Sequence, residues 1–102
     1  MKIYLTEKAH KEKDSLGYAV SSKFDTLFEK ATKGSELSKK DYKKLAGYSN
    51  LCEFRVKHNT NIYRGLGGFI KKDVFVVLFI RKKSQRLPRN VIKKVQNRLK
   101  QI

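Results

Sequence analysis

The chain has 102 residues, of which 25 are Lys or Arg and 9 are Asp or Glu, so its formal net charge is +16. A hydrophobic content of 39% is too high for a disordered tail, and the length predicts a single domain, residues 1–102, with a modest core. The excess of positive charge predicts a polyanionic partner, which could be nucleic acid, the ribosome or an acidic protein.

The first third of the chain predicts a short strand followed by two helices. Residues 2–5 alternate as a strand, and Thr6 is suited to cap a helix from Glu7 to about Leu16. Gly17 interrupts that helix, with one bent helix as the alternative. The second helix is expected to begin at a cap on Ser21 or Ser22 and to end at Gly34. Its apolar stripe consists of Val20, Phe24, Leu27, Phe28 and Ala31.

Residues 39–46 predict a short helix that closes at Gly47, with Tyr42 and Leu45 facing inward. Its lysines either form a solvated face or contact phosphate groups. They are Lys39, Lys40, Lys43 and Lys44.

The second half of the chain predicts three consecutive strands and a closing helix. Residues 53–58 alternate, and the turn at residues 59–61 leads into a second strand over residues 62–69. Val74 to Ile80 is apolar throughout, as expected for a central strand covered on both faces. Pro88 suits a first helical turn. The fold class is therefore α+β, with two N-terminal helices, an antiparallel sheet of three to four strands and a C-terminal helix. That helix has an apolar stripe of Val91, Ile92, Val95 and Leu99.

Several kinds of site are excluded by residue counts. The single cysteine, Cys52, excludes an internal disulfide and a cysteine zinc cluster. Two-metal nucleases need several close carboxylates, whereas the strand region has only Glu53 and Asp73. No apolar run is long enough to span a membrane, and no signal peptide is expected. We therefore expect a cytoplasmic protein that uses no metal and no cofactor and does not bind a membrane.

The ordered motifs of the second half resemble the RelE/HigB group of bacterial type II toxins, including its phage-derived branch. The motifs are EFR at 53–55, a short turn, IYR at 62–64, an apolar strand and KKSQ at 82–85 ahead of Pro88. The resemblance implies a RelE-like fold. It also implies metal-independent cleavage of mRNA on the ribosome, in which the RNA supplies its 2′-hydroxyl as nucleophile.

The resemblance implies catalytic roles for basic side chains, because Arg and Lys stabilise developing phosphorane charge. Arg64 matches the family's strand arginine, which contacts the scissile phosphate; the alternative is a structural arginine paired with Glu53 or Asp73. Lys57 and His58 match a region with phosphate-binding or proton-transfer roles, although His58 could also be an ordinary exposed turn histidine. The remaining catalytic candidates are Lys82 and Lys83, which match the family's terminal basic cluster.

The other candidates would bind RNA without taking part in the chemistry. Arg55 could contact a phosphate or form a structural ion pair, and the rest lie in turns or at a strand end. They are Arg81, Gln85, Lys71 and Lys72.

The resulting interpretation is a toxin that cleaves mRNA with the ribosome and is neutralised by a cognate antitoxin, expected to be a helix-turn-helix protein. Well-known members of the group carry a tyrosine or histidine near the C-terminus, but nothing after Lys83 is aromatic or histidine. A gyrase inhibitor of the ParE type therefore remains an alternative. A second alternative is a non-catalytic basic module that binds nucleic acid without cleaving it.

Overall fold

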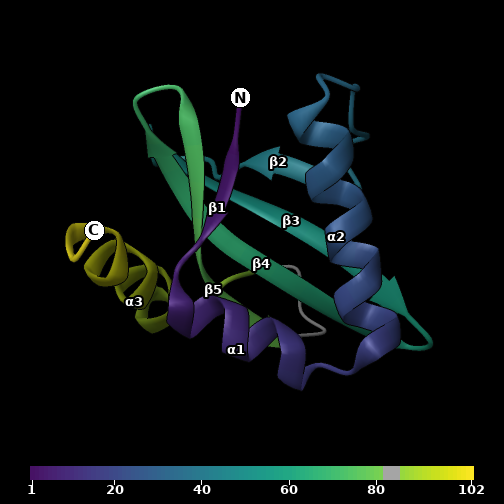
Figure 1. Cartoon of the computed structure of the whole chain (residues 1–102). Helices are drawn as coiled ribbons and strands as arrows, with labels where there is room; N and C mark the ends of the chain where they lie inside the picture. Colours follow the sequence, from purple (N-terminus) through teal and green to yellow (C-terminus); the bar gives the residue numbers. More distant parts are fainter. Residues whose placement is uncertain (82–85) are drawn as a thin grey trace.

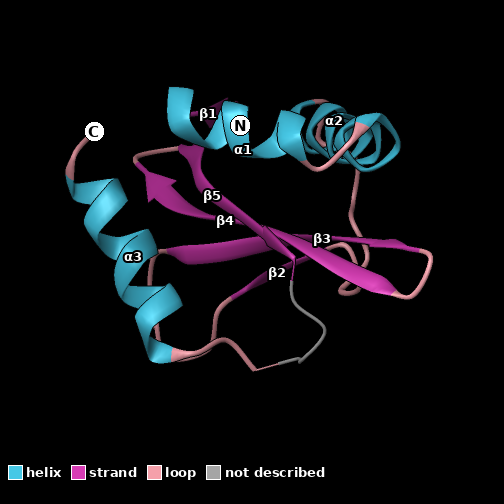
Figure 2. Cartoon of the chain, turned by 90° about the horizontal axis from the view of Figure 1, so that it is seen from below, coloured by secondary structure: helices cyan, strands magenta, loops and turns pink. Residues whose placement is uncertain are grey.

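The computed structural model describes residues 1–81 and 86–102, in which a sheet lies between helices packed on its two faces (Figures 1 and 2). The elements follow the chain as β1 (Ile3–Leu5), α1 (Glu7–Ser15), α2 (Tyr18–Thr32), β2 (Tyr42–Lys44), β3 (Leu51–His58), β4 (Asn61–Ile70), β5 (Asp73–Arg81) and α3 (Arg89–Lys100).

The sheet has five strands in the order β1-β5-β4-β3-β2. β1 runs parallel to β5, whereas the other neighbouring strands are antiparallel. The helices and the sheet agree only roughly with the sequence prediction. The sheet has five strands instead of the expected three to four, and it is mixed because β1 pairs in parallel with β5.

The extra strand is β2, which replaces the helix predicted over residues 39–46. Tyr42 pairs with Phe54, and Lys44 pairs with Cys52. Tyr42 packs against the core on the α2 side of the sheet, whereas Leu45 is buried on the α3 side. Two residues three positions apart, such as Tyr42 and Leu45, share one face of a helix but lie on opposite faces of a strand. Both can be buried in either case when the strand is covered on its two faces, so these two apolar residues alone do not distinguish a helix from a strand.

The two N-terminal helices are separate. Thr6 caps α1 by accepting a hydrogen bond from the Ala9 amide at 3.2 Å, as predicted. Gly17, with φ of 97°, divides the helices, and α2 begins at Tyr18 rather than after the serines at 21 and 22. A positive φ is accessible to glycine without a steric penalty, which explains the break. Gly34 follows the end of α2 with φ of 80°.

Each face of the sheet has its own core. The predicted stripe of α2 packs on one face, together with side chains of β3, β4 and β5 such as Phe54, Tyr63 and Phe79. On the other face, Ile92 and Val95 of α3 join a second cluster, against which Val91 and Leu99 also pack. Figure 2 shows α1 and α2 on one side of the sheet and α3 at one end of the other side. The predicted central strand 74–80 contributes to both cores, as expected.

At a bulge in β5, an ion pair between side chains of α1 and α3 also hydrogen-bonds to the backbone of the strand. Opposite β4, the register shifts so that Val77 is an extra residue, and β1 pairs with β5 only as far as Val76. Beyond that point Glu12 accepts a hydrogen bond from the Phe79 amide at 3.1 Å. Arg98 donates to the Val77 carbonyl at 2.8 Å and to the Glu12 carboxylate at 2.9 Å. Side chains of α1 and α3 thus satisfy backbone groups at the edge of β5.

Cys52 is expected to be protected from thiol reagents in the folded protein. It has no exposed surface, and burial raises its pKa to about 12, with the nearby Glu53 charge acting in the same direction. Because the thiolate is the reactive form, labelling at pH 8 should be at least about tenfold slower in the folded chain than in denaturant. Absorbance of a released chromophore measures the rate, and equally fast labelling in both states would contradict this expectation. The chain has one cysteine, so the signal reports on Cys52 alone.

Candidate nucleic-acid interface

Three positive side chains surround one buried carboxylate on the α3 side of the sheet. Strand alternation in β3 turns Glu53 to the same face as Leu51, which contacts α3. Arg64 of β4 donates through Nη1 to the two Glu53 oxygens at 2.8 and 3.1 Å, and neither residue has exposed surface. Arg55 Nε lies 3.5 Å and Lys43 Nζ 3.8 Å from Glu53 Oε1. Three cations around one anion leave an excess of positive charge, and we call these four residues the Glu53 cluster.

Arg64 therefore lies where the structural alternative placed it, in an ion pair with Glu53. A buried charge is stable only with a partner, so the two side chains hold each other in place. Arg55 is also fixed, because its Nη2 donates to the Lys39 carbonyl at 2.9 Å. The exposed cations of the cluster are Arg55 and Lys43, whose side chains are 20% and 44% exposed. These two, rather than Arg64, are the members that a ligand can reach in this arrangement.

A hollow of about 330 Å³ lies beside the β3 edge, on one side of the Glu53 cluster. β2 pairs with β3 only as far as Phe54, so the hollow opens where β3 continues past its partner. Lys57 is exposed there, and Lys23 of α2 approaches from the opposite wall. The described lining residues are Lys23, Thr26, Leu27, Asp41, Arg55, Val56 and Lys57. We call this hollow the β3-edge hollow.

A second hollow, of about 380 Å³, lies on the other side of the cluster, where α3 begins. Lys43 and Glu53 belong to both the cluster and this lining. The first turn of α3 carries no acidic residue, so the positive end of the helix adds to the local potential. The described lining residues are Lys43, Leu45, Ala46, Tyr48, Glu53, Arg86, Leu87, Arg89 and Ile92. We call this hollow the Tyr48 pocket.

His58 lies apart from the Glu53 cluster. Alternation along β3 places it on the face of Phe54 and Val56, as the sequence predicted, and therefore opposite Arg55 and Lys57. Lys23 Nζ lies 3.1 Å from His58 Nδ1. Lysine is only a donor, so this contact is a hydrogen bond only when Nδ1 accepts. The structure brings His58 next to Lys23 but not next to Arg64.

The remaining candidates are dispersed. Arg81 pairs with Tyr63 at the end of β5 and is exposed. Lys71 and Lys72 form the β4–β5 turn, at the opposite end of the ten-residue β4 from Lys57. A strand of that length spans roughly 30 Å, so one compact ligand could not contact both ends. Lys82, Lys83 and Gln85 lie outside the described residues.

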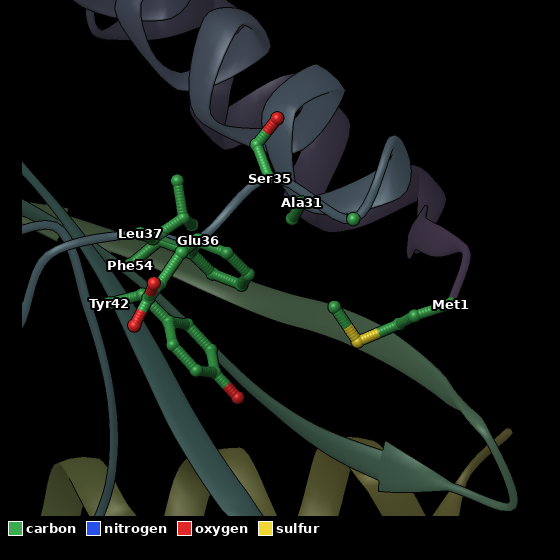
Figure 3. Close-up of a pocket in the computed structure, with 8 residues that line it drawn as sticks. Met1, Ala31, Ser35, Glu36, Leu37, Tyr42 and Phe54 are labelled. Atoms are coloured by element: carbon green, nitrogen blue, oxygen red, sulfur yellow. The ribbon is translucent and has the colours of Figure 1, made fainter.

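A third hollow has a different character. It opens between the end of α2 and β2, where the side chains of Leu37, Tyr42 and Phe54 lie close together opposite Met1 (Figure 3). None of its described lining residues is a Lys or Arg. The hollow therefore offers no cationic side chain to a phosphate. In the described parts of the chain, no group of three or more His, Cys, Asp or Glu is arranged to hold a metal ion.

The sequence analysis missed the residues of the Tyr48 pocket. Lys43 was expected on a solvated helix or at a phosphate, not beside Glu53, because residues 39–46 were predicted to be helical. Its strand position opposite Glu53 brings the two together. Residues 42–44 are Tyr-Lys-Lys, which has no alternation of apolar and polar residues and is too short to identify a strand by itself.

Comparisons with known proteins give one match. A family model described as "Phage derived protein Gp49-like (DUF891)" matches residues 11–100. The matched region includes every strand except β1 and all the residues of the Glu53 cluster. Neither the search of curated proteins nor the search of solved structures gave a match. Among the described residues, no helix is long and apolar enough to cross a membrane.

Proposed function

The chain belongs to the phage-derived Gp49-like family, which is associated with toxin–antitoxin systems, and on this premise we propose that it is a toxin that cleaves mRNA. The proposed cleavage occurs on the translating ribosome. The partner is a cognate antitoxin that covers the basic surface. The observation that carries the proposal is the Glu53 cluster, which places the partly exposed Arg55 and the exposed Lys43 between two hollows.

The proposed reaction uses the RNA's own nucleophile. The 2′-oxygen loses its proton and attacks the neighbouring phosphorus, so an O2′–P bond forms while the P–O5′ bond breaks. The leaving 5′-oxygen takes up a proton, which yields a 2′,3′-cyclic phosphate and a 5′-hydroxyl. Negative charge accumulates on the phosphoryl oxygens in the transition state, and donors already in position stabilise it.

In this proposal Arg55 and Lys57 bind the scissile phosphate. Arg55 can act with little reorganisation, because Glu53 and the Lys39 carbonyl hold its guanidinium. Lys57 is two residues further along the same face of β3 and is exposed. Arg64 is a positioning residue in this scheme, since it holds the Glu53 carboxylate in place without exposed surface of its own.

Ribosome-dependent cleavage can be tested in a purified translation system with a reporter mRNA whose ends are mapped with and without ribosomes. The informative variant is Lys57→Ala, which should slow cleavage about tenfold or more by removing one donor to the phosphorane. Lys72→Ala is the matched control, because it removes the same charge from another exposed lysine at the far turn of the sheet. It should cleave like the wild type.

Intact mRNA during normal translation by the wild type would sink the proposed function. A supercoiling assay with gyrase would then test the ParE-type alternative. Equal loss of cleavage in Lys57→Ala and Lys72→Ala would instead show that total charge, and not the β3-edge hollow, governs the activity.

A further inference from the structure

We infer that the Tyr48 pocket binds one base of single-stranded RNA, beside the phosphate held at the Glu53 cluster. This inference rests on the proposed function and adds a base-binding subsite to it. Glu53 connects the two places, because Arg55 on one side and Lys43 on the other both lie within 4 Å of its Oε1 atom. A strand of RNA that crosses the cluster would therefore reach the pocket with its next nucleotide.

The floor of the pocket suits the flat, apolar surface of a base. Leu45 and Ile92 are 8% and 7% exposed and belong to the core under α3, so the floor is held by packing. Leu87 packs against the same cluster. Bases that leave a stack bind to apolar and aromatic surfaces, which replace the neighbouring bases.

Tyr48 provides the aromatic surface. Its side chain is 37% exposed, and its backbone amide donates to the Leu45 carbonyl at 3.2 Å. Gly47, with φ of 84°, makes the turn that brings the residue over the floor. A ring that is fixed at its backbone and open on one side can stack on a base at little cost in conformational entropy.

Cations surround the same pocket. Lys43 lies at the boundary with the Glu53 cluster, while Arg86 and Arg89 are exposed at the start of α3. Phosphates on either side of a bound base would meet these positive charges. The hollow in Figure 3 has aromatic and apolar walls but no Lys or Arg among its described lining residues. Of these two hollows, only the Tyr48 pocket combines an aromatic and apolar surface for the base with Lys and Arg side chains for the phosphates.

The test measures equilibrium binding of a fluorescent single-stranded RNA oligonucleotide by anisotropy, without ribosomes. Tyr48→Ala should weaken binding roughly tenfold, within the range measured when one stacking aromatic is removed. Tyr48→Phe should bind like the wild type, because the ring is retained. Tyr18→Ala is the matched control, since Tyr18 is 90% exposed on α2 and should not contribute.

An oligonucleotide with abasic sites separates base stacking from charge. Wild type and Tyr48→Ala should bind it equally, and the salt dependence of RNA binding should be the same in both proteins because no charge is removed. Equal binding of normal RNA by wild type and Tyr48→Ala would overturn the inference while leaving the proposed function intact. A similar loss on the abasic strand would overturn it too. If the wild type bound no RNA, the inference would be overturned, and cleavage in the translation system would still decide the proposed function.

Discussion

Replacing Arg64 with methionine is expected to lower the free energy of unfolding by about 3 kcal/mol, because the buried carboxylate of Glu53 would lose its closest partner. The carboxylate has no exposed surface, so water cannot replace the two lost hydrogen bonds. Arg55 and Lys43 remain within 4 Å, which places the expected loss at the lower end of the range for broken buried pairs. Urea denaturation followed by circular dichroism measures the change.

A double-mutant cycle separates the ion pair from simple loss of packing. The double variant Arg64→Met with Glu53→Leu removes both charges, and it should be less destabilised than the sum of the two single variants. Replacing a buried ion pair with apolar side chains is often nearly neutral, whereas removing one partner is not. Additive single and double effects would show that the pair contributes only through its volume.

The affinity for single-stranded RNA is expected to fall about 100-fold between 50 and 200 mM salt. Each Lys or Arg that contacts a phosphate of a single strand releases counterions and adds about 0.7 to the slope of the logarithm of the binding constant against the logarithm of the salt concentration. About five such contacts give a fall of this size. The described linings of the two hollows hold six Lys and Arg side chains, enough for about five such contacts. They are Lys23, Lys43, Arg55, Lys57, Arg86 and Arg89.

Single substitutions test which lysines make these contacts. Lys57→Ala should reduce the logarithmic salt slope by about 0.7, while Lys72→Ala should leave it unchanged. Anisotropy titrations at four salt concentrations are sufficient to measure the slope. An equal decrease in both variants would mean that RNA binds the whole basic surface without preference for the hollows.

Local patterns in the sequence determined much of the fold. The stripe of α2 from Val20 to Ala31, the apolar run of β5 and the stripe of α3 were each predicted correctly. These elements are long enough for their periodicity to distinguish a helix from a strand, or to show burial on both faces. The alternation of β3 also predicts that His58 and Arg55 lie on opposite faces of the sheet, since successive side chains of a strand point in opposite directions.

The secondary structure of short segments and the pairing of distant strands were determined only in the tertiary structure. β2 is only three residues long, and it is a strand because β3 offers it a hydrogen-bonding edge. β1 pairs in parallel with β5, the most distant strand in the sequence, which no local pattern reveals. The sequence left Arg64 with two possible roles, and the structure shows it buried in an ion pair with Glu53. The energy of an ion pair depends on the distance between the two charges and on their burial. A sequence pattern contains neither quantity, so the ion-pair partners of a charged residue are identified only once the strands have come together in the folded structure.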